Sequence, residues 1–239
     1  MTAPLFLAGD VTNDVLTLAG DEGRHAATVR RIAPGERVDV GDGRGSVAEC
    51  VVTAVTRDTL TLEVDKRRTE PPPAPRLVVV QALAKGDRAE DAVEAMTEVG
   101  VDEVVPWAAA RSIVRWDGER GEKALRRWRA TAREAAKQAR RAWVPEVTAP
   151  ATTKEVADRL RAASLAVVLH ESATAPLATA TVPDAGELVV VVGPEGGIGD
   201  DELAAFGVAP YRLGRSVLRT STAGVAAAAV LLSRTPRWR

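Results

Sequence analysis

The first part of the chain consists of short apolar runs separated by Gly and Asp turns. The runs alternate only partly between apolar and polar residues. Such spacing is typical of a small β-structure whose strands follow one another through tight turns. We therefore predict a small antiparallel barrel built from strands at 4–9, 15–20, 36–43, 45–55 and 59–65.

A proline cluster ends this region. The stretch TEPPPAPR at 69–76 holds three consecutive prolines and a fourth soon after. Proline lacks a backbone N–H, so this stretch cannot sit inside a helix or a central strand. We predict a stiff linker over 71–75, which separates an N-terminal domain at 1–70 from a C-terminal domain at 76–239.

After the prolines the pattern changes to apolar runs that alternate with amphipathic segments. Alternating strands and helices predict an α/β domain with a parallel sheet that is covered on both faces. The expected strands are 76–83, 101–107, 164–171, 187–193 and 211–214. The expected helices are 86–100, 121–143, 156–163, 200–207 and an alanine-rich helix that starts near Ser221.

Composition places the 239 residues among soluble globular proteins, with 46% hydrophobic and 27% charged residues. The single cysteine, Cys50, lies in an apolar run and is predicted to be a buried, inert thiol. The start of the chain has no basic segment followed by an apolar core, which is not typical of a signal peptide. The apolar run at 223–232 is too short to cross a bilayer. We expect a cytoplasmic protein without a membrane anchor.

Charge is strongly segregated although the net charge is only −1. Residues 111–141 hold eleven Lys/Arg against four Asp/Glu, and residues 142–210 hold three against ten. Residues 211–239 hold six Arg and no acid. Two basic blocks in a near-neutral chain favour an anionic partner, of which nucleic acid is the commonest.

The segment VVVVGPEGGIGDDELAAFG at 189–207 joins an apolar strand to a helix through a glycine loop. Backbone N–H groups at such a turn suit anionic or polar ligand groups. A P-loop requires Lys and Ser/Thr after the last glycine, but Asp200 and Asp201 follow here. The acid that a dinucleotide fold places about twenty residues further on is absent. Glu195 and the acids that follow would repel a polyphosphate, so S-adenosylmethionine (SAM), a cationic nucleoside without phosphate, fits better.

These residues resemble the GPEGG loop of the SPOUT methyltransferases, and in particular the 16S rRNA uridine N3-methyltransferases (the RsmE family). The resemblance spans nearly the whole chain in the family's order. It is carried by GRHAATVRRIAPGERVDVGDGRG at 23–45, QALAKGDRAEDAVEAMTEVGVDEVVPW at 81–107, RSIVRW at 111–116, RWRATAREAAKQARRAWVPEV at 127–147, GPEGG at 193–197 and LGRSVLRTSTAGVAAAAVLL at 213–232.

One position departs from the family pattern. The family commonly has a glutamate where this chain has Ser221. A hydroxyl at that position can still cap the following helix, but a carboxylate is lost. A catalytic role for that acid is therefore not transferred to this chain.

The resemblance implies a PUA-like RNA-binding barrel followed by a SPOUT domain with a trefoil knot and a homodimeric enzyme. It also implies SAM as the cofactor and 16S rRNA or the small ribosomal subunit as the partner. No cluster with metal-ligand spacing occurs in the sequence, so we expect no metal. The implied cofactor contacts are Leu169, His170, Glu171, Gly193, Pro194, Glu195, Gly196, Gly197, Leu213, Gly214, Val217, Leu218, Thr220 and Ala223.

Methyl transfer to uracil N3 requires positioning, loss of the N3 proton and stabilisation of the resulting anion. Arg219 is the first candidate for that stabilisation or for holding a neighbouring phosphate; an arginine that only neutralises loop carbonyls is the structural alternative. Glu195 is the second catalytic candidate, with the cofactor amine, the N3 proton or loop structure as its possible tasks. We expect Thr220 and Ser221 to cap the last helix.

The predicted RNA contacts are basic residues of both domains: Arg24, His25, Arg30, Arg31, Lys85, Arg88, Arg111 and Arg115. The basic face of the helix at 121–143 is either a further contact or a solvated surface. Trp107, Trp116, Trp128 and Trp143 can stack on bases, although packing within the protein is the more ordinary role. The alternative functions are a knotted methyltransferase for another RNA, such as tRNA ribose, a non-catalytic RNA-binding protein and a nucleotide-dependent oxidoreductase.

Overall fold

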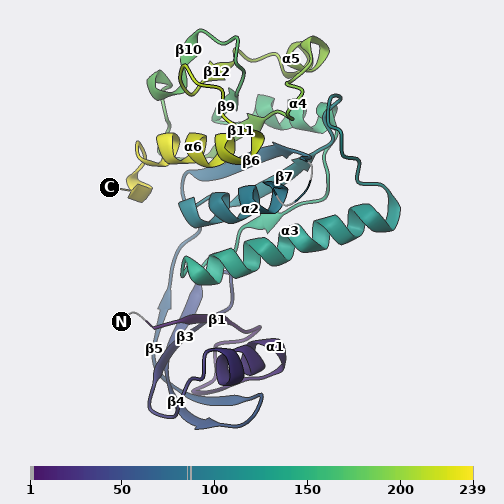
Figure 1. The fold of residues 1–239 in the computed structure, drawn as a ribbon. Helices are drawn as coiled ribbons and strands as arrows, with labels where there is room; N and C mark the ends of the chain where they lie inside the picture. The colour runs from purple at the N-terminus through teal and green to yellow at the C-terminus, as the bar shows by residue number, and fades with distance from the viewer. Residues whose placement is uncertain (1–2, 85, 87, 239) are drawn as a thin grey trace. The chain divides into compact units, whose positions relative to one another are not determined.

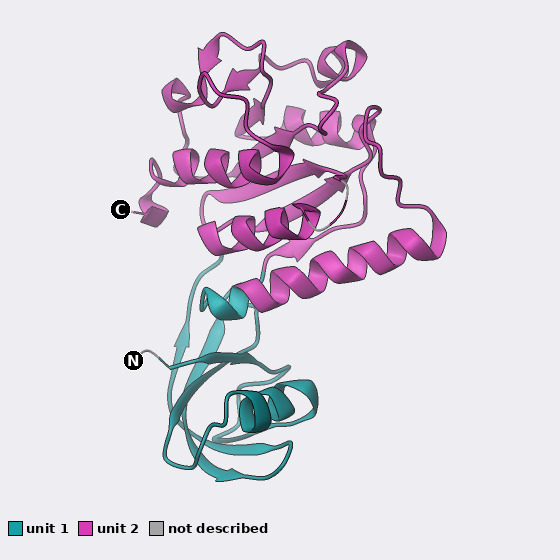
Figure 2. Ribbon diagram, viewed as in Figure 1, with its two compact units in different colours: residues 1–72, 136–144 teal, residues 73–135, 145–239 magenta. Residues whose placement is uncertain are grey.

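The computed structural model describes residues 3–84, 86 and 88–238. The chain forms two compact units (Figure 2). The first comprises Met1–Pro72 and Ala136–Val144, and the second comprises Pro73–Ala135 and Pro145–Arg239. The domain limits expected from the sequence stay a prediction.

Unit 1 contains a five-stranded sheet with the order β1-β3-β4-β5-β2. The strands are β1 (Leu5–Leu7), β2 (Val15–Leu18), β3 (Arg37–Gly41), β4 (Ser46–Val55) and β5 (Leu60–Thr69). All pairings are antiparallel as expected, except that β1 runs parallel to β3. Cys50 lies in the core of this sheet, and burial raises the pKa of its thiol to about 11. The predicted buried thiol is therefore confirmed.

Unit 1 also contains a helical segment that the sequence analysis missed. Helix α1 (Gly20–Arg24) continues into the π-helical turn η1 (His25–Val29). The segment is short, and Gly23 and Ala26 are its only fully buried residues. A helix with so few inward-facing apolar residues leaves too weak a periodic pattern to be detected.

Unit 2 is built on a five-stranded parallel sheet with the order β8-β7-β6-β11-β9 (Figure 1). The strands are β6 (Arg76–Ala82), β7 (Glu103–Trp107), β8 (Glu146–Val147), β9 (Leu165–Val168) and β11 (Glu187–Val192). The parallel sheet confirms the predicted fold class. The two-residue strand β8 is too short to produce an apolar run, and the sequence analysis missed it.

Helices cover both faces of this sheet. On one face lie α2 (Arg88–Val99), α3 (Gly118–Gln138) and α6 (Thr220–Leu232), whose apolar side chains share a core with the inward residues of β6 and β11. On the other face lie α4 (Thr153–Ala162) and α5 (Asp200–Phe206). Helix α3 begins at residue 118 and ends at residue 138, in contrast to the expected range of 121–143.

The chain after β9 forms the short strand β10 (Ala175–Pro176) and the 3-10 turn η2 (Leu177–Thr179). Strand β10 pairs with β12 (Tyr211–Arg212), which is shorter than the strand expected at 211–214. A last 3-10 turn, η3 (Pro236–Trp238), ends the described chain. None of the helices in the described ranges combines the length and the apolar character that a membrane span requires. The trefoil knot stays a prediction.

Candidate cofactor site and basic surfaces

The three loops predicted to hold the cofactor lie at the carboxyl edge of the parallel sheet of unit 2. The first two follow the adjacent strands β9 and β11. The backbone N–H of Leu169 donates to the Val191 carbonyl oxygen (3.0 Å), and that of His170 donates to the Tyr211 carbonyl oxygen (3.0 Å). The third predicted loop begins at Leu213, two residues after Tyr211. The carboxyl edge is also where open α/β sheets bind ligands.

The glycine loop at 193–199 is shaped by its own packing. Gly197 has a φ of +74°, a conformation that favours glycine, and its N–H donates to the Pro194 carbonyl oxygen (2.9 Å). A Cβ at Gly193 would lie 2.7 Å from Cγ1 of Ile198. These glycines are therefore needed for the loop itself, irrespective of a ligand.

Arg111 lies against this loop. A Cβ at Gly196 would lie 3.2 Å from the Cβ of Arg111 and 3.3 Å from its carbonyl oxygen. The Nη1 of Arg111 donates to the carbonyl oxygen of Gly196 at 3.3 Å. The structure thus joins Arg111, which was predicted to contact RNA, to a loop that was predicted to contact the cofactor.

Glu202, a residue that the sequence analysis did not single out, joins three loops at the same edge. Its side chain is buried, at 5% exposure. One oxygen accepts from the Ala110 N–H (2.8 Å) and the Thr153 hydroxyl (3.3 Å), and the other accepts from the Gly199 N–H (3.1 Å). The glutamate three residues after Gly199 is the sequence signal that predicts this contact at a helix start.

The three acids that follow the glycine loop differ in their surroundings. Glu202 accepts hydrogen bonds within the protein, whereas Asp200 and Asp201 are exposed. Glu195 is exposed as well. The repulsion of a polyphosphate by these acids stays a prediction.

His170 is held by the turn that follows it. Its Nδ1 accepts from the backbone N–H of Ser172 (3.2 Å) and also lies 2.7 Å from the Ser172 hydroxyl oxygen. Because the backbone N–H of Ser172 can only donate, Nδ1 is the acceptor, and in a neutral ring the proton is then on Nε2. The ring is half-buried, and its neighbour Glu171 is exposed. This arrangement agrees with a lining residue and not with a free base at Nδ1.

The third loop, from Leu213 to Arg219, exposes most of its side chains. Val217 is 78% exposed and Leu218 40% exposed, unusual values for apolar residues. Apart from its two neighbours in the chain, no described residue has an atom within 4 Å of the position that a Cβ at Gly214 would take. In contrast to the glycines of the 193–199 loop, Gly214 faces open space.

The start of α6 differs from the expectation that Thr220 and Ser221 cap the helix. The N-cap is Arg219, whose extended backbone (φ −67°, ψ 154°) precedes Thr220, and no side chain caps the helix. Thr220 is buried at 8% exposure, whereas Arg219 is exposed. The capping role is therefore wrong, because the helix starts one residue before Ser221. Ala223 is also buried, one turn into the helix.

Gln81, at the end of β6, is a second buried residue that the sequence analysis missed. Its Nε2 donates to the carbonyl oxygens of Ala82 (3.3 Å) and Thr220 (3.4 Å). Its Oε1 has no hydrogen-bond partner among the described residues. A single polar residue in an otherwise apolar strand is the signal that points to it.

In unit 1, the predicted RNA contacts lie close together in the sequence: Arg24 ends α1, His25 begins η1, and Arg30 and Arg31 follow η1. Arg24 is exposed and paired with Asp21. His25 is half-buried, with its ring centroid 6.3 Å from that of Phe6. Arg30 and Arg31 are exposed. Arg24 and His25 are therefore helical, whereas Arg30 and Arg31 belong to the turn that follows η1. Their contact with RNA stays a prediction.

The remaining predicted contacts belong to unit 2. Arg88 is exposed at the start of α2, and the exposed Arg115 reaches the Ala110 carbonyl oxygen at 3.5 Å. Lys85 lies outside the described residues. Trp107 and Trp128 are buried in the core, so neither can stack on a base in this structure. Trp116 packs edge-on against Trp128, and Trp143 donates to the Glu70 carbonyl oxygen (3.0 Å).

Comparisons with known proteins agree with this architecture. The family described as "RNA methyltransferase domain" matches residues 70–232, and the family "RNA methyltransferase PUA domain" matches residues 18–65. Ribosomal RNA small subunit methyltransferase E of Mycobacterium bovis is 46% identical, over 100% of this chain and 94% of the relative. The protein of the same name from Bacillus subtilis is 29% identical, over 87% of this chain and 85% of the relative.

A solved structure extends the likeness to three dimensions. Ribosomal RNA small subunit methyltransferase E from Neisseria gonorrhoeae, bound to S-adenosyl methionine, superimposes with a TM-score of 0.87 at 25% identity, over 98% of each chain. The mycobacterial relative aligns with the whole chain, and the two family matches cover most of it. The chain belongs to the ribosomal RNA small subunit methyltransferase E family (RsmE) of the SPOUT methyltransferases.

Proposed function

We propose that this protein is a SAM-dependent methyltransferase that methylates N3 of a specific uridine in 16S rRNA. The single observation that carries the proposal is the 46% identity, over the whole chain, to a ribosomal RNA small subunit methyltransferase E. The specific atom, uracil N3, rests on the resemblance of the motifs. The open space beside Gly214 and the exposed side chains of Val217 and Leu218 support an enzyme over a protein that only binds RNA.

The residues of the three loops fit SAM. Gly214 faces open space, so a ligand can approach the backbone there without a clash. Val217 and Leu218 offer exposed apolar side chains that a nucleoside base would cover. The related protein from Neisseria gonorrhoeae binds S-adenosyl methionine with the same overall fold. We assign to this site the fourteen cofactor contacts named in the sequence analysis.

When bound, SAM supplies an electrophilic methyl group on a positively charged sulfur. The chain's own task is to hold uracil N3 in line with that group and to manage the N3 proton. Two observations support this role for Arg219: its backbone is the N-cap of α6, and its side chain is exposed. Its guanidinium stabilises the uracil anion or holds the adjacent phosphate.

Glu195 is the second catalytic candidate. It is exposed in the turn of the glycine loop, where it contacts the cofactor amine or accepts the N3 proton. Ser221 supplies no carboxylate, so the proposal gives the catalytic carboxylate role to Glu195. His170 lines the first loop and presents Nε2–H as a donor.

The rRNA is held, in this proposal, by the basic residues of both units. Arg24, His25, Arg30 and Arg31 form the contact of unit 1, and Arg88 and Arg115 contribute from unit 2. A base in structured RNA must leave its stack before N3 is reachable. We further propose that the protein works as a homodimer in the cytoplasm, without a metal.

The decisive experiment compares rRNA from a strain that lacks the gene with rRNA from the complemented strain. Nucleoside mass spectrometry is expected to show N3-methyluridine in 16S rRNA only in the complemented strain. Purified protein, SAM and unmethylated small subunits or naked 16S rRNA should restore the mark and reveal the preferred substrate. Retention of N3-methyluridine in the deletion strain would refute the proposal. Loss of a tRNA ribose methyl group instead would favour the other knotted methyltransferases.

A further inference from the structure

Arg111 was predicted from the sequence as a phosphate contact, but the structure lays it along the glycine loop. Its Cβ and carbonyl oxygen lie 3.2 and 3.3 Å from the position of a Cβ at Gly196, and its Nη1 donates to the Gly196 carbonyl oxygen at 3.3 Å. Further along the loop, its Nε lies 3.9 Å from the position of a Cβ at Gly199. The side chain therefore follows the loop over several residues.

The backbone next to Arg111 is tied to the same loop by a second contact. Glu202 accepts hydrogen bonds from the N–H groups of Ala110 (2.8 Å) and Gly199 (3.1 Å). Its carboxylate is buried and lies 3.7 Å from the same Gly199 position. The exposed Arg111 and the buried Glu202 thus both connect the glycine loop to residues 110–111.

We propose that Arg111 is a positioning residue that sets the shape of the cofactor-binding glycine loop, and that it is not a phosphate contact. The inference rests on the proposed function, because it takes the 193–199 loop as part of the SAM site. A loop with four glycines has many accessible conformations, and ordering it on binding would cost affinity. Bonds that order the loop beforehand remove part of that cost.

Arg111→Ala tests the inference because the two roles move different measurements. If Arg111 positions the loop, its loss should lower the affinity for SAM. The hydrogen bond that is lost comes from a charged group, so calorimetry should show an affinity about fivefold to tenfold lower than that of the wild type. The affinity for unmethylated 16S rRNA, measured without SAM, is expected to stay within about twofold because no phosphate contact is lost. Arg111 is exposed, so the variant should fold.

Two further variants make the result specific. Arg111→Gln removes the charge but keeps an amide donor, so its SAM affinity should fall between those of the wild type and Arg111→Ala. Arg30→Ala is the matched control: Arg30 is an exposed arginine of unit 1 with a predicted phosphate contact. It should weaken RNA binding, reduce the salt dependence of log K by about 0.7 to 0.9 and leave SAM affinity unchanged.

The outcomes separate this inference from the proposed function. Wild-type SAM affinity from Arg111→Ala, or a reduced salt dependence of its RNA binding, would overturn the inference while the proposed function stands. Equal SAM affinities for Arg111→Gln and Arg111→Ala would also contradict it, since a retained donor should preserve part of the loop's order. A wild-type protein that bound no SAM would overturn the proposed function and this inference together.

Discussion

The two edges of the parallel sheet in unit 2 use the same residue types in opposite ways. At the amino edge, arginines and glutamates bind one another. At the carboxyl edge, arginines and glutamates are instead exposed to solvent or hydrogen-bonded to loops. The role of an arginine in this fold therefore depends on the groups that it contacts and not on its position in a basic segment of the sequence.

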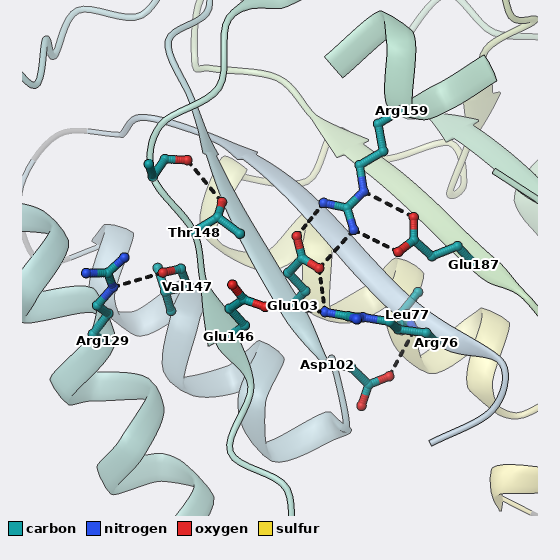
Figure 3. A network of polar contacts seen from close by, with 11 residues as sticks. Arg76, Leu77, Asp102, Glu103, Arg129, Glu146, Val147, Thr148, Arg159 and Glu187 are labelled. Carbon is teal, nitrogen blue, oxygen red and sulfur yellow. Dashed lines mark hydrogen bonds and ion pairs between the residues drawn. The ribbon is translucent and has the colours of Figure 1, made fainter. Parts of the chain in front are cut away.

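Figure 3 shows the network at the amino edge. Arg159 binds Glu103 and Glu187 with paired hydrogen bonds, and Arg76 binds Glu103 at 2.6 Å. Although burial by itself lowers the pKa of the Arg159 guanidinium, its bonds to Glu103 and Glu187 raise that pKa above its usual range. Arg237 adds a bond to Asp102 (2.6 Å).

At the carboxyl edge, Arg219 makes no side-chain hydrogen bond or ion pair with the residues that the structure describes. Glu195 is exposed, and Gly214 faces open space. Since burying an unpaired charge is costly, an arginine held at an exposed helix start is available for a ligand. The amino edge therefore stabilises the fold, and the carboxyl edge is the part that can change its contacts.

The largest expected effect is at the amino edge. Glu103 is only 3% exposed, and Glu103→Ala leaves Arg159 and Arg76 without their shared carboxylate. Both arginines are partly exposed, so each lost charged hydrogen bond is given the lower end of its usual range, about 1.5 kcal/mol. The free energy of unfolding should therefore fall by about 3 kcal/mol in total. Urea unfolding measures this loss. SAM affinity of the remaining folded protein should be unchanged; a specific loss of SAM affinity would blur the distinction between the two edges.

Arg219→Ala should do the opposite at the carboxyl edge. The variant removes an exposed side chain, so the unfolding free energy should change by less than about 0.5 kcal/mol. Single-turnover methylation should slow by about 100-fold, the usual cost of removing one group that stabilises a developing anion. SAM affinity should be largely kept, as calorimetry can show. An unchanged single-turnover rate would contradict the catalytic role of Arg219.

Much of this fold was visible in the sequence. The apolar runs of β6, β7, β9 and β11 predicted a parallel sheet because strands buried on both faces are almost wholly apolar. Elements with little buried surface were missed, namely α1, η1 and the two-residue strands β8 and β10. Propensity and periodicity detect long, amphipathic elements, whereas the missed elements have too few residues to produce a signal of either kind.

The site was predicted less completely for a different reason. The glycine loop and Arg219 stand out as motifs, but Glu202 is the third of three consecutive acids, and the sequence does not tell which of them turns inward. Gln81 and Arg111 likewise depend on which residues lie beside them across the fold. Contacts between loops of distant sequence position are set by the sheet order, which periodicity cannot provide.

Gly214→Ala is the next smaller test, and it concerns the ligand alone. Gly214 does not have a positive φ, and a Cβ there would meet no atom within 4 Å among the residues that the structure describes, so the fold should tolerate alanine. If SAM approaches this backbone, the added methyl group should weaken its binding by about tenfold, or 1.4 kcal/mol. Calorimetry with SAM and thermal unfolding measure the two quantities.

Gly196→Ala is the matched control for that prediction. Its Cβ would lie 3.2 Å from Arg111, so stability should fall together with SAM affinity. If Gly214→Ala also lost stability and Gly196→Ala did not, the assignment of open space to the third loop would be wrong. The pair therefore distinguishes a glycine that makes room for a ligand from one that makes room for the protein.

The smallest expected effect belongs to Glu195, the exposed carboxylate of the glycine loop. Exposed charge pairs contribute about 0.2–1 kcal/mol, so Glu195→Gln should weaken SAM binding by about threefold. S-adenosylhomocysteine keeps the amine but lacks the charged sulfur, so it distinguishes a contact of Glu195 with the amine from one with the sulfonium. Equal losses for both ligands place Glu195 at the amine, whereas a loss confined to SAM places it near the sulfonium. If neither affinity changes and the methylation rate falls, the carboxylate acts on the N3 proton; if nothing changes, it only shapes the turn.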